Sequence, residues 1–187
     1  MYRSVFASVG YLLRTMTGFA VLVFLVTTSA HAQQPSDEAC KLLQPAEIES
    51  AIGGKTLKFS GFTNNAQGMT QNVCTVGIKK PGQTGALVIT IHIATNLPYD
   101  GDYGIRASIK GAARQDQWKV KGAQFDEKTV GNAMCTMSGR PNVPVHTVCS
   151  IPRGKGYVQV DMQARTLKEL ASMDAVGALV QKAYTRW

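Results

Sequence analysis

The sequence predicts an α+β fold in which helices cover an antiparallel β-sheet. Three observations favour this class: the expected elements run helix, strands, helix, strands, helix; several extended segments alternate in hydrophobicity; and the links at 82–85 and 153–156 are short. Short links join antiparallel neighbours, because parallel strands need a long crossover. We therefore expect one sheet with antiparallel neighbours.

The first 32 residues have the pattern of a secretory signal peptide. Arg3 and Arg14 precede an apolar run at 19–26, and Ala30-His31-Ala32 forms an A-x-A cleavage site. This run is shorter than the roughly 20 apolar residues that span a membrane. We expect cleavage near Ala32, no stable membrane insertion, and a periplasmic or secreted product.

The predicted mature chain has a short polar lead-in at 33–39 and a single α+β domain at 40–187. Its 155 residues suffice for a substantial core. Loss of Arg3 and Arg14 lowers the formal charge from +8 to +6, because the signal holds no acidic residue. A basic exported domain can meet an envelope protein or an anionic envelope component, whereas nucleic acid is not expected there.

All four cysteines follow the predicted cleavage site, which indicates two disulfides among three possible pairings. Cys135 and Cys149 lie in extended segments around the turn-prone stretch 138–144, so we expect them to pair across neighbouring strands. Closing this loop would contribute about 3 kcal/mol. Cys40 would then pair with Cys74. Neither spacing is the C-x-x-C of a redox pair.

The first expected element is a short helix opened by Pro45. Glu47 lies in its first turn, and Gly53 and Gly54 follow its end. Its expected buried side consists of Leu43, Ala46 and Ile52.

Strands follow, because apolar residues recur at every second position. The expected strands lie around 57–59, 74–78 and 87–93. The last is the clearest, with isoleucines at 89, 91 and 93 on one face and His92 on the other. We expect it to be a central strand.

A second helix is predicted from Tyr103 to Gln115, with an apolar stripe of Ile105, Ile109 and Ala112. An irregular stretch is expected from there through Lys128. Extended segments then follow at 133–137, 143–149 and 157–164. The last alternates strictly, which suits a sheet with one drier face.

The final helix is predicted to start at Thr166, because Thr166 and Glu169 have capping-box spacing. Its apolar side would dock on the sheet. That side consists of Leu167, Leu170, Leu179, Val180 and Ala183.

The segment 40–53, Cys-Lys-Leu-Leu-Gln-Pro-Ala-Glu-Ile-Glu-Ser-Ala-Ile-Gly, resembles the opening of a group of uncharacterised exported bacterial domains of lipoprotein type. In that group a cysteine before a Leu-Leu helix start pairs with a later strand cysteine. The resemblance implies a Mog1/PsbP-like α/β/α sandwich and supports pairing of Cys40 with Cys74. Gln44 replaces the Thr or Ser of the group. The resemblance implies no activity.

Motifs of catalysis or cofactor binding are absent from the sequence: it has no G-x-S-x-G, H-E-x-x-H or phosphate-binding loop. His92 and His146 lack a second ligand at metal spacing, so we expect no metal and no cofactor. One catalytic alternative stays open. Ser150, His146 and Asp161 could meet in space as a hydrolase triad.

One helical face is expected to be basic, since Arg106, Lys110 and Arg114 recur every four residues and repel one another. Trp118, Lys119 and Lys121 follow directly. We call these six residues the basic stripe and take it as a possible contact for an anionic partner. The alternative is a solvated surface neutralised by Asp102, Asp116 or Asp126.

The export signal, the paired cysteines and the missing catalytic motifs together predict a non-catalytic binding or accessory domain of the bacterial cell envelope. The alternative is a small secreted hydrolase with a Ser/His/Asp site. These two readings differ in structure, since an enzyme needs a pocket with convergent polar groups.

Overall fold

A computed structural model describes residues 34–66, 68–82, 87–114, 122–140 and 143–187. Within these residues it contains three α-helices, α1 (Pro45–Ile52), α2 (Gly101–Arg114) and α3 (Met173–Arg186), and a short 3-10 helix η1 (Ala39–Lys41). The strands are β1 (Gln34–Pro35), β2 (Lys55–Ala66), β3 (Met69–Lys79), β4 (Leu87–Thr95), β5 (Gln124–Val130), β6 (Ala133–Gly139), β7 (Val145–Pro152) and β8 (Tyr157–Ala164).

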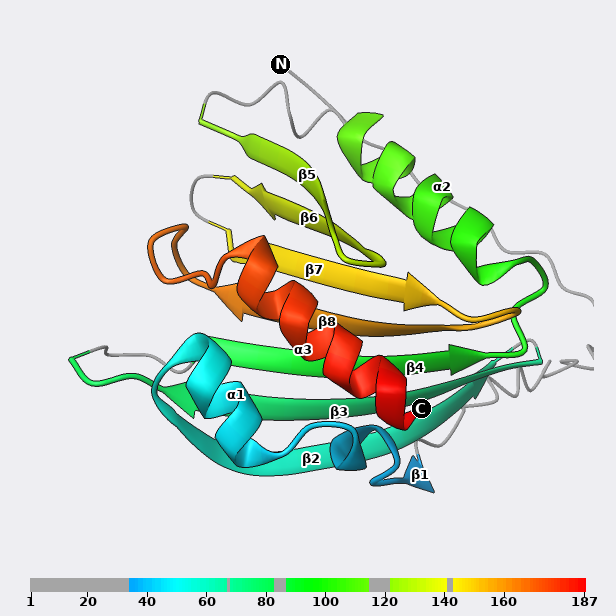
Figure 1. Ribbon diagram of the computed structural model, residues 1–187, viewed down its shortest axis with the longest axis horizontal. Coiled ribbons are helices and arrows are strands. Elements are labelled where there is room, and N and C mark those ends of the chain that lie inside the picture. The colour runs from blue at the N-terminus through cyan, green and yellow to red at the C-terminus, as the bar shows by residue number, and fades with distance from the viewer. Residues whose placement is uncertain (1–33, 67, 83–86, 115–121, 141–142) are drawn as a thin grey trace, which may run out of the picture. The chain divides into compact units, whose positions relative to one another are not determined.

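The strands form one antiparallel sheet in the order β1-β2-β3-β4-β8-β7-β6-β5 (Figure 1). Each half is a meander of consecutive strands, and the halves meet where β4 pairs with β8. The predicted α+β class with an antiparallel sheet is confirmed. The clear alternation at 87–93 indeed marks a central strand, because β4 has a neighbour on each side.

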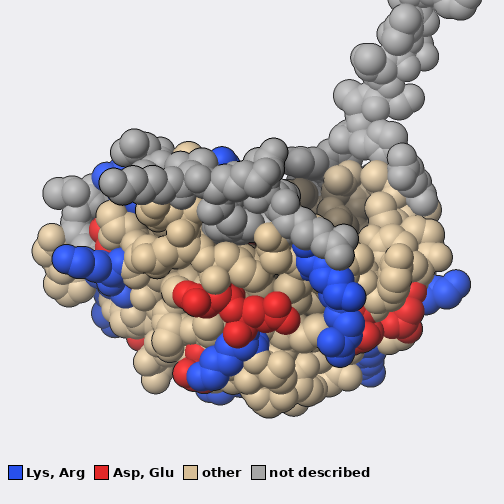
Figure 2. All heavy atoms as spheres, turned by 90° about the horizontal axis from the view of Figure 1, so that it is seen from above, with Lys and Arg blue, Asp and Glu red and all other residues tan. Residues whose placement is uncertain are grey.

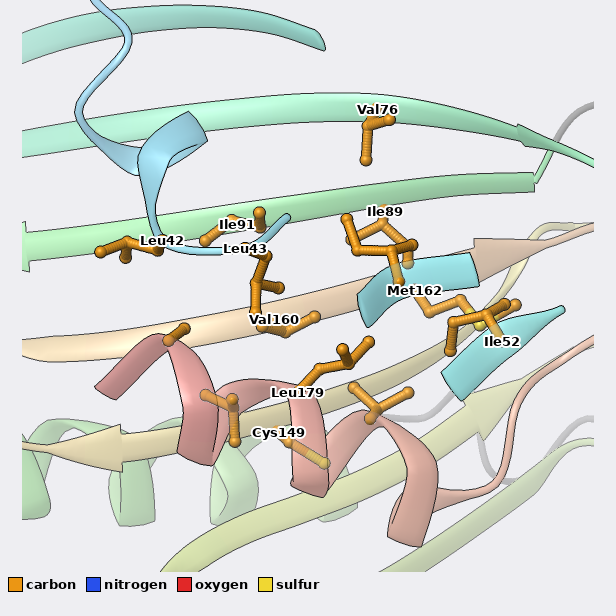
Figure 3. Close-up of a cluster of buried hydrophobic side chains, with 14 of the residues drawn as sticks. Leu42, Leu43, Ile52, Val76, Ile89, Ile91, Cys149, Val160, Met162 and Leu179 are labelled. Atoms are coloured by element: carbon orange, nitrogen blue, oxygen red, sulfur yellow. The ribbon is translucent and has the colours of Figure 1, made fainter. Parts of the chain in front are cut away.

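The helices η1, α1 and α3 cover one face of the sheet (Figure 1), and the hydrophobic core lies beneath them. A row of fully buried side chains crosses the sheet below these helices. Figure 3 shows Leu43 and Leu179 close to the strand residues that they bury. The row consists of Cys74, Ile91, Val160, Cys149 and Cys135.

Both predicted disulfides are present, Cys40–Cys74 and Cys135–Cys149. The first ties η1 to β3, and the second joins the directly opposed residues of β6 and β7. Gly61 lies on β2, directly opposite Cys74 on β3, and leaves space for the Cys40–Cys74 disulfide. A Cβ at Gly61 would overlap the carbonyl oxygen of Ser36 and lie 3.0 Å from Cys40 Sγ.

Helix α1 matches its prediction in extent: Pro45 opens it, and Gly53 ends it at φ 79°. The Gln44 backbone N–H donates to Glu47 Oε2 at 2.9 Å, so the helix has its capping contact without Thr or Ser. The prediction of Ala46 as buried was wrong, because Ala46 is exposed. Ile48 is fully buried instead, one half-turn further along.

Helix α3 begins at Met173, seven residues after the predicted start. Ser172 is its N-cap and accepts a hydrogen bond from the Ala175 N–H at 3.2 Å. The Thr166 N–H does donate to Glu169 Oε2 at 3.1 Å, but this contact closes an isolated turn. The capping contact at Thr166 is therefore not sufficient to start a helix there.

The prediction of an irregular stretch through Lys128 was wrong in part, because strand β5 occupies Gln124–Val130. It pairs with β6 across a two-residue turn whose first residue, Gly131, has φ 60°. A two-residue loop with a left-handed first residue is a standard hairpin connection. Residues 124–130 form a strand because they pair with β6, since their own sequence does not alternate between apolar and polar residues.

Candidate functional site

The second face of the sheet is more polar than the face that holds the core. On β8 the buried Val158, Val160 and Met162 alternate with partly exposed Tyr157, Gln159 and Asp161. This alternation confirms the predicted sheet with one drier face. Helix α2 packs on the polar face near β7, with Ile105 buried there.

A pocket of about 400 Å³ lies between α2 and strands β6, β7 and β8. Its size falls within the range of about 300–1,000 Å³ typical of small-ligand sites. We call it the α2 pocket. Its lining consists of Tyr99, Gly104, Ile105, Ser108, Ile109, Met134, Thr136, Ser138, His146, Val148, Ser150, Tyr157 and Gln159.

The pocket has an apolar side and a polar side. The α2 side contributes the apolar Ile105 and Ile109, whereas the strands contribute hydroxyl groups, the Gln159 amide and the His146 imidazole. No Lys, Arg, Asp or Glu belongs to this lining among the described residues. The pocket therefore offers hydrogen bonds without a formal charge of its own, apart from His146 when it is protonated.

His146 and Asp161 form the best-defined polar pair at this site. His146 Nδ1 lies 3.1 Å from Asp161 Oδ1. Because Asp161 accepts this hydrogen bond, it raises the pKa of His146, and partial burial opposes the rise. With Nδ1 engaged, Nε2 is the ring nitrogen left for a ligand.

Ser150 does not join this pair, so the trio proposed from the sequence is not assembled. The Ser150 hydroxyl donates to Gln159 Oε1 at 3.1 Å. His146 and Ser150 lie on the same face of β7, but four residues of strand separate their Cα atoms by about 13 Å. Nearness in sequence was misleading here because a strand is extended.

The hydroxyl nearest in register to His146 is that of Ser138, which sequence reasoning missed. Ser138 on β6 stands directly opposite His146 on β7. Its side chain has no hydrogen bond to any described residue. Ser138 could be linked to His146 only through the register of the β6–β7 hairpin, and that register is not known before the two strands are paired.

His92 lies elsewhere on the polar face, opposite Gln159 on β8. Burial lowers its pKa, and the charge of Asp161 partly offsets the effect. Within the described ranges no group of three His, Cys, Asp or Glu side chains is placed to hold a metal ion.

The structure describes only part of the basic stripe. Arg106 and Lys110 are exposed on α2, and Arg114 is its last residue. Trp118, Lys119 and Lys121 lie outside the described residues. In the view of Figure 2, acidic side chains lie beside basic ones, and the described Lys and Arg residues form no continuous patch there.

Arg106 is partly neutralised, because its Nε lies 2.8 Å from Asp102 Oδ2 one turn earlier on α2. A second hollow, of about 240 Å³, separates α2 from β5 and is lined by Arg106, Lys110, Lys128 and the acidic Glu127. The charge of Arg106 is thus neutralised by Asp102, as one of the alternatives for the basic stripe predicted.

The chain matches no protein-family model. It also matches no protein in a search of curated sequences. None of the helices in the described part of the chain is both long and apolar enough to cross a membrane. What the chain does must therefore be inferred from the chemistry of its own surface.

Proposed function

We propose that the chain is an exported, non-catalytic binding or accessory domain of the bacterial cell envelope, and that the α2 pocket is its ligand site. One observation carries this proposal: strands β6, β7 and β8 direct their polar side chains into a pocket that α2 covers from one side. Small-molecule sites have this combination of apolar wall and few polar groups.

Export is supported by the signal-like N-terminus and by the disulfides. Two bonds that involve every cysteine of the chain are typical of an oxidising, extracytoplasmic environment. Release to the periplasm or beyond the cell, after cleavage near Ala32, is the localisation that we propose.

The finer fold type belongs to the same proposal. Helices on both faces of an antiparallel sheet support a Mog1/PsbP-like α/β/α sandwich. In addition, the exposed Arg106 and Lys110 on α2 offer a second, smaller contact for an anionic envelope component.

A hydrolase remains the second candidate because of one observation, the His146–Asp161 pair with Ser138 opposite. A nucleophile needs a hydrogen bond to its base, and no described hydrogen bond joins Ser138 to His146. We expect a fluorophosphonate probe to leave both Ser138 and Ser150 unlabelled. Covalent labelling of Ser138 that is lost in His146→Gln would overturn the non-catalytic proposal.

The binding site is tested by filling the α2 pocket. Ser108 on α2 lines the pocket, whereas its neighbour Ala107 is exposed outside this lining, so Ser108→Trp and Ala107→Trp form a matched pair. Amide chemical shifts of the purified protein are recorded with a library of water-soluble fragments. We expect the shifts to cluster around His146 and Gln159 in the wild type and in Ala107→Trp, and to disappear in Ser108→Trp.

Shifts that scatter over the whole surface, or that persist unchanged in Ser108→Trp, would contradict the assignment of the pocket. Circular dichroism of both variants checks that each is folded. Because neither Ala107 nor Ser108 belongs to the hydrophobic core, neither substitution disturbs the core beneath α3.

A further inference from the structure

We propose that the ligand of the α2 pocket is a neutral saccharide. This inference rests on the binding function proposed above and names the chemical class of its ligand. It is carried by three properties of the described residues: the uncharged lining, the lining groups without a described hydrogen-bond partner, and the exposed tyrosines beside the pocket.

The described lining carries no formal charge apart from a protonated His146, which disfavours strongly ionic ligands. An ion that enters a partly enclosed site without a partner of opposite charge loses hydration that nothing replaces. The described lining offers no Lys, Arg, Asp or Glu, and the charge of a protonated His146 is already balanced by Asp161. Phosphates and dicarboxylates therefore fit the pocket poorly.

Several polar groups of the lining have no described partner. They are the hydroxyls of Thr136, Ser138 and Tyr157, the amide nitrogen of Gln159 and Nε2 of His146. Burial, with Tyr99 nearby, raises the pKa of Tyr157, so its hydroxyl stays protonated and able to donate. A ligand with several hydroxyl groups satisfies such a set of donors and acceptors.

The apolar part of the pocket fits the apolar face of a sugar ring. A pyranose ring has a face of C–H groups, which packs against aromatic and aliphatic side chains while its hydroxyls bind elsewhere. Ile105 and Ile109 form such a wall on α2.

Two tyrosines extend this apolar surface at the start of α2. Tyr99 lines the pocket and is 43% exposed, and Tyr103 is 67% exposed. Their ring centroids lie 6.2 Å apart in an edge-on arrangement. Exposed tyrosines combine a flat apolar surface with a hydroxyl, as saccharide recognition requires.

Gly104 allows this arrangement. A Cβ at Gly104 would overlap the ring of Tyr99, so glycine leaves room for this ring beside the beginning of α2. The aromatic surface is therefore held in place before any ligand arrives, which lowers the entropic cost of binding.

The test is a titration of the purified protein with neutral saccharides, followed by amide chemical shifts. The probes are glucose, N-acetylglucosamine, cellobiose and a soluble glucan, so that free sugars and polymer ends are compared. Inorganic phosphate and decanoate serve as ionic and apolar probes. We expect at least one saccharide to shift the amides around Tyr99, His146 and Gln159.

The variants separate ring packing from other effects. Tyr103→Ala should weaken saccharide affinity about threefold to tenfold, whereas Tyr103→Phe should keep it within about twofold, because the ring remains. Gln159→Leu should weaken affinity about tenfold by removing the amide. Leu57→Ala is the control, since Leu57 is another exposed apolar residue, on β2.

Failure of this inference differs from failure of the proposed function. If decanoate or library fragments occupy the pocket while every saccharide leaves the spectrum unchanged, the saccharide class is wrong and the pocket remains a binding site. Saccharide shifts confined to regions away from Tyr99 and Gln159, or equal affinity in Tyr103→Ala and wild type, would also overturn it.

Discussion

Asp161 fixes the imidazole of His146 in one orientation by accepting a hydrogen bond from Nδ1. The two residues come from neighbouring strands, β7 and β8, and Asp161 lies two residues along β8 from Gln163, the direct partner of His146. This diagonal placement turns Nε2 away from the carboxylate. A single hydrogen bond on the sheet thus decides which atom of His146 meets a ligand.

The protonation of His146 gives the first prediction. Asp161→Asn should lower the pKa of His146, because the accepted hydrogen bond and the negative charge that raise it are lost. The raised pKa means that the pair stabilises the fold fully below about pH 6.5 and loses this contribution as the pH rises through the folded-state pKa. Since His146 is 36% exposed, we expect less than about 1 kcal/mol.

Imidazole NMR titration measures the pKa, and unfolding at pH 5.5 and pH 9 measures the stability. His92→Gln is the control and should leave the titration of His146 unchanged. An unchanged His146 pKa in Asp161→Asn would show that the hydrogen bond does not form in solution.

At the residue scale, the sequence predicted one polar pair of this site, His146 with Asp161. His146 and Asp161 were recognised as residue types that could meet, and neighbouring strands bring them together. Ser150 was misplaced because its closeness in sequence counts for little along an extended strand. Tyr99 and Tyr157 were missed, since only the docking of α2 on the polar face brings them to one pocket.

Among the elements, α1 and α3 are joined by ion pairs at Glu47, from Arg186 and from Lys182. Arg186 near the end of α3 donates to both carboxylate oxygens of Glu47 on α1, at 2.6 and 2.8 Å. These hydrogen bonds, with one from the Gln44 backbone, lower the pKa of Glu47 to about 2. The carboxylate is thus bound most strongly in its ionised form.

The second prediction concerns acid stability. The pKa of Glu47 falls from 4.5 to about 2 on folding, so its stabilising contribution is present above pH 4.5 and is lost as the pH falls toward 2. Arg186→Gln should therefore destabilise the fold at pH 7 and do so distinctly less at pH 2.5, where Glu47 loses much of its ionised form. Urea unfolding at both pH values measures the difference.

Lys182→Gln is the matched control, because Lys182 Nζ lies 3.6 Å from Glu47 and makes the weaker contact. It should cost less than Arg186→Gln at pH 7. An Arg186→Gln loss that is the same at both pH values would assign the effect to the Arg186 hydrogen bond with the Leu42 carbonyl instead.

The elements found from the sequence were those with a strong pattern of their own. The isoleucines at 89, 91 and 93 made β4 plain, and Pro45 and Gly53 marked the ends of α1. Strand β5 lacks alternation, and its signal was the hairpin pair Gly131-Asn132. The start of α3 was misplaced because two capping signals compete, at Thr166 and at Ser172, and only the second precedes a sustained apolar stripe.

Across the whole molecule, the sheet consists of two halves joined at β4 and β8, and each half has its own disulfide. Cys40–Cys74 spans a sequence separation of 34 residues, and Cys135–Cys149 spans 14. The longer closed loop removes more entropy from the unfolded chain.

The third prediction compares the two bonds. The double variant Cys40→Ala/Cys74→Ala should lose about 4 kcal/mol and Cys135→Ala/Cys149→Ala about 3 kcal/mol, in the chain-entropy description. Guanidinium unfolding without reductant measures both. The reverse order would mean that packing of the fully buried Cys135 and Cys149 outweighs loop length.

If the chain is exported as we propose, the pairing of consecutive cysteines bears on the order in which its disulfides form. Cys40 and Cys74 lie entirely ahead of Cys135 and Cys149 in the sequence. A chain that enters an oxidising compartment from its N-terminus therefore exposes the first two thiols together, before either of the others arrives. Each cysteine then has its correct partner as the first one within reach, and oxidation in order of arrival gives the native bonds without reshuffling by an isomerase.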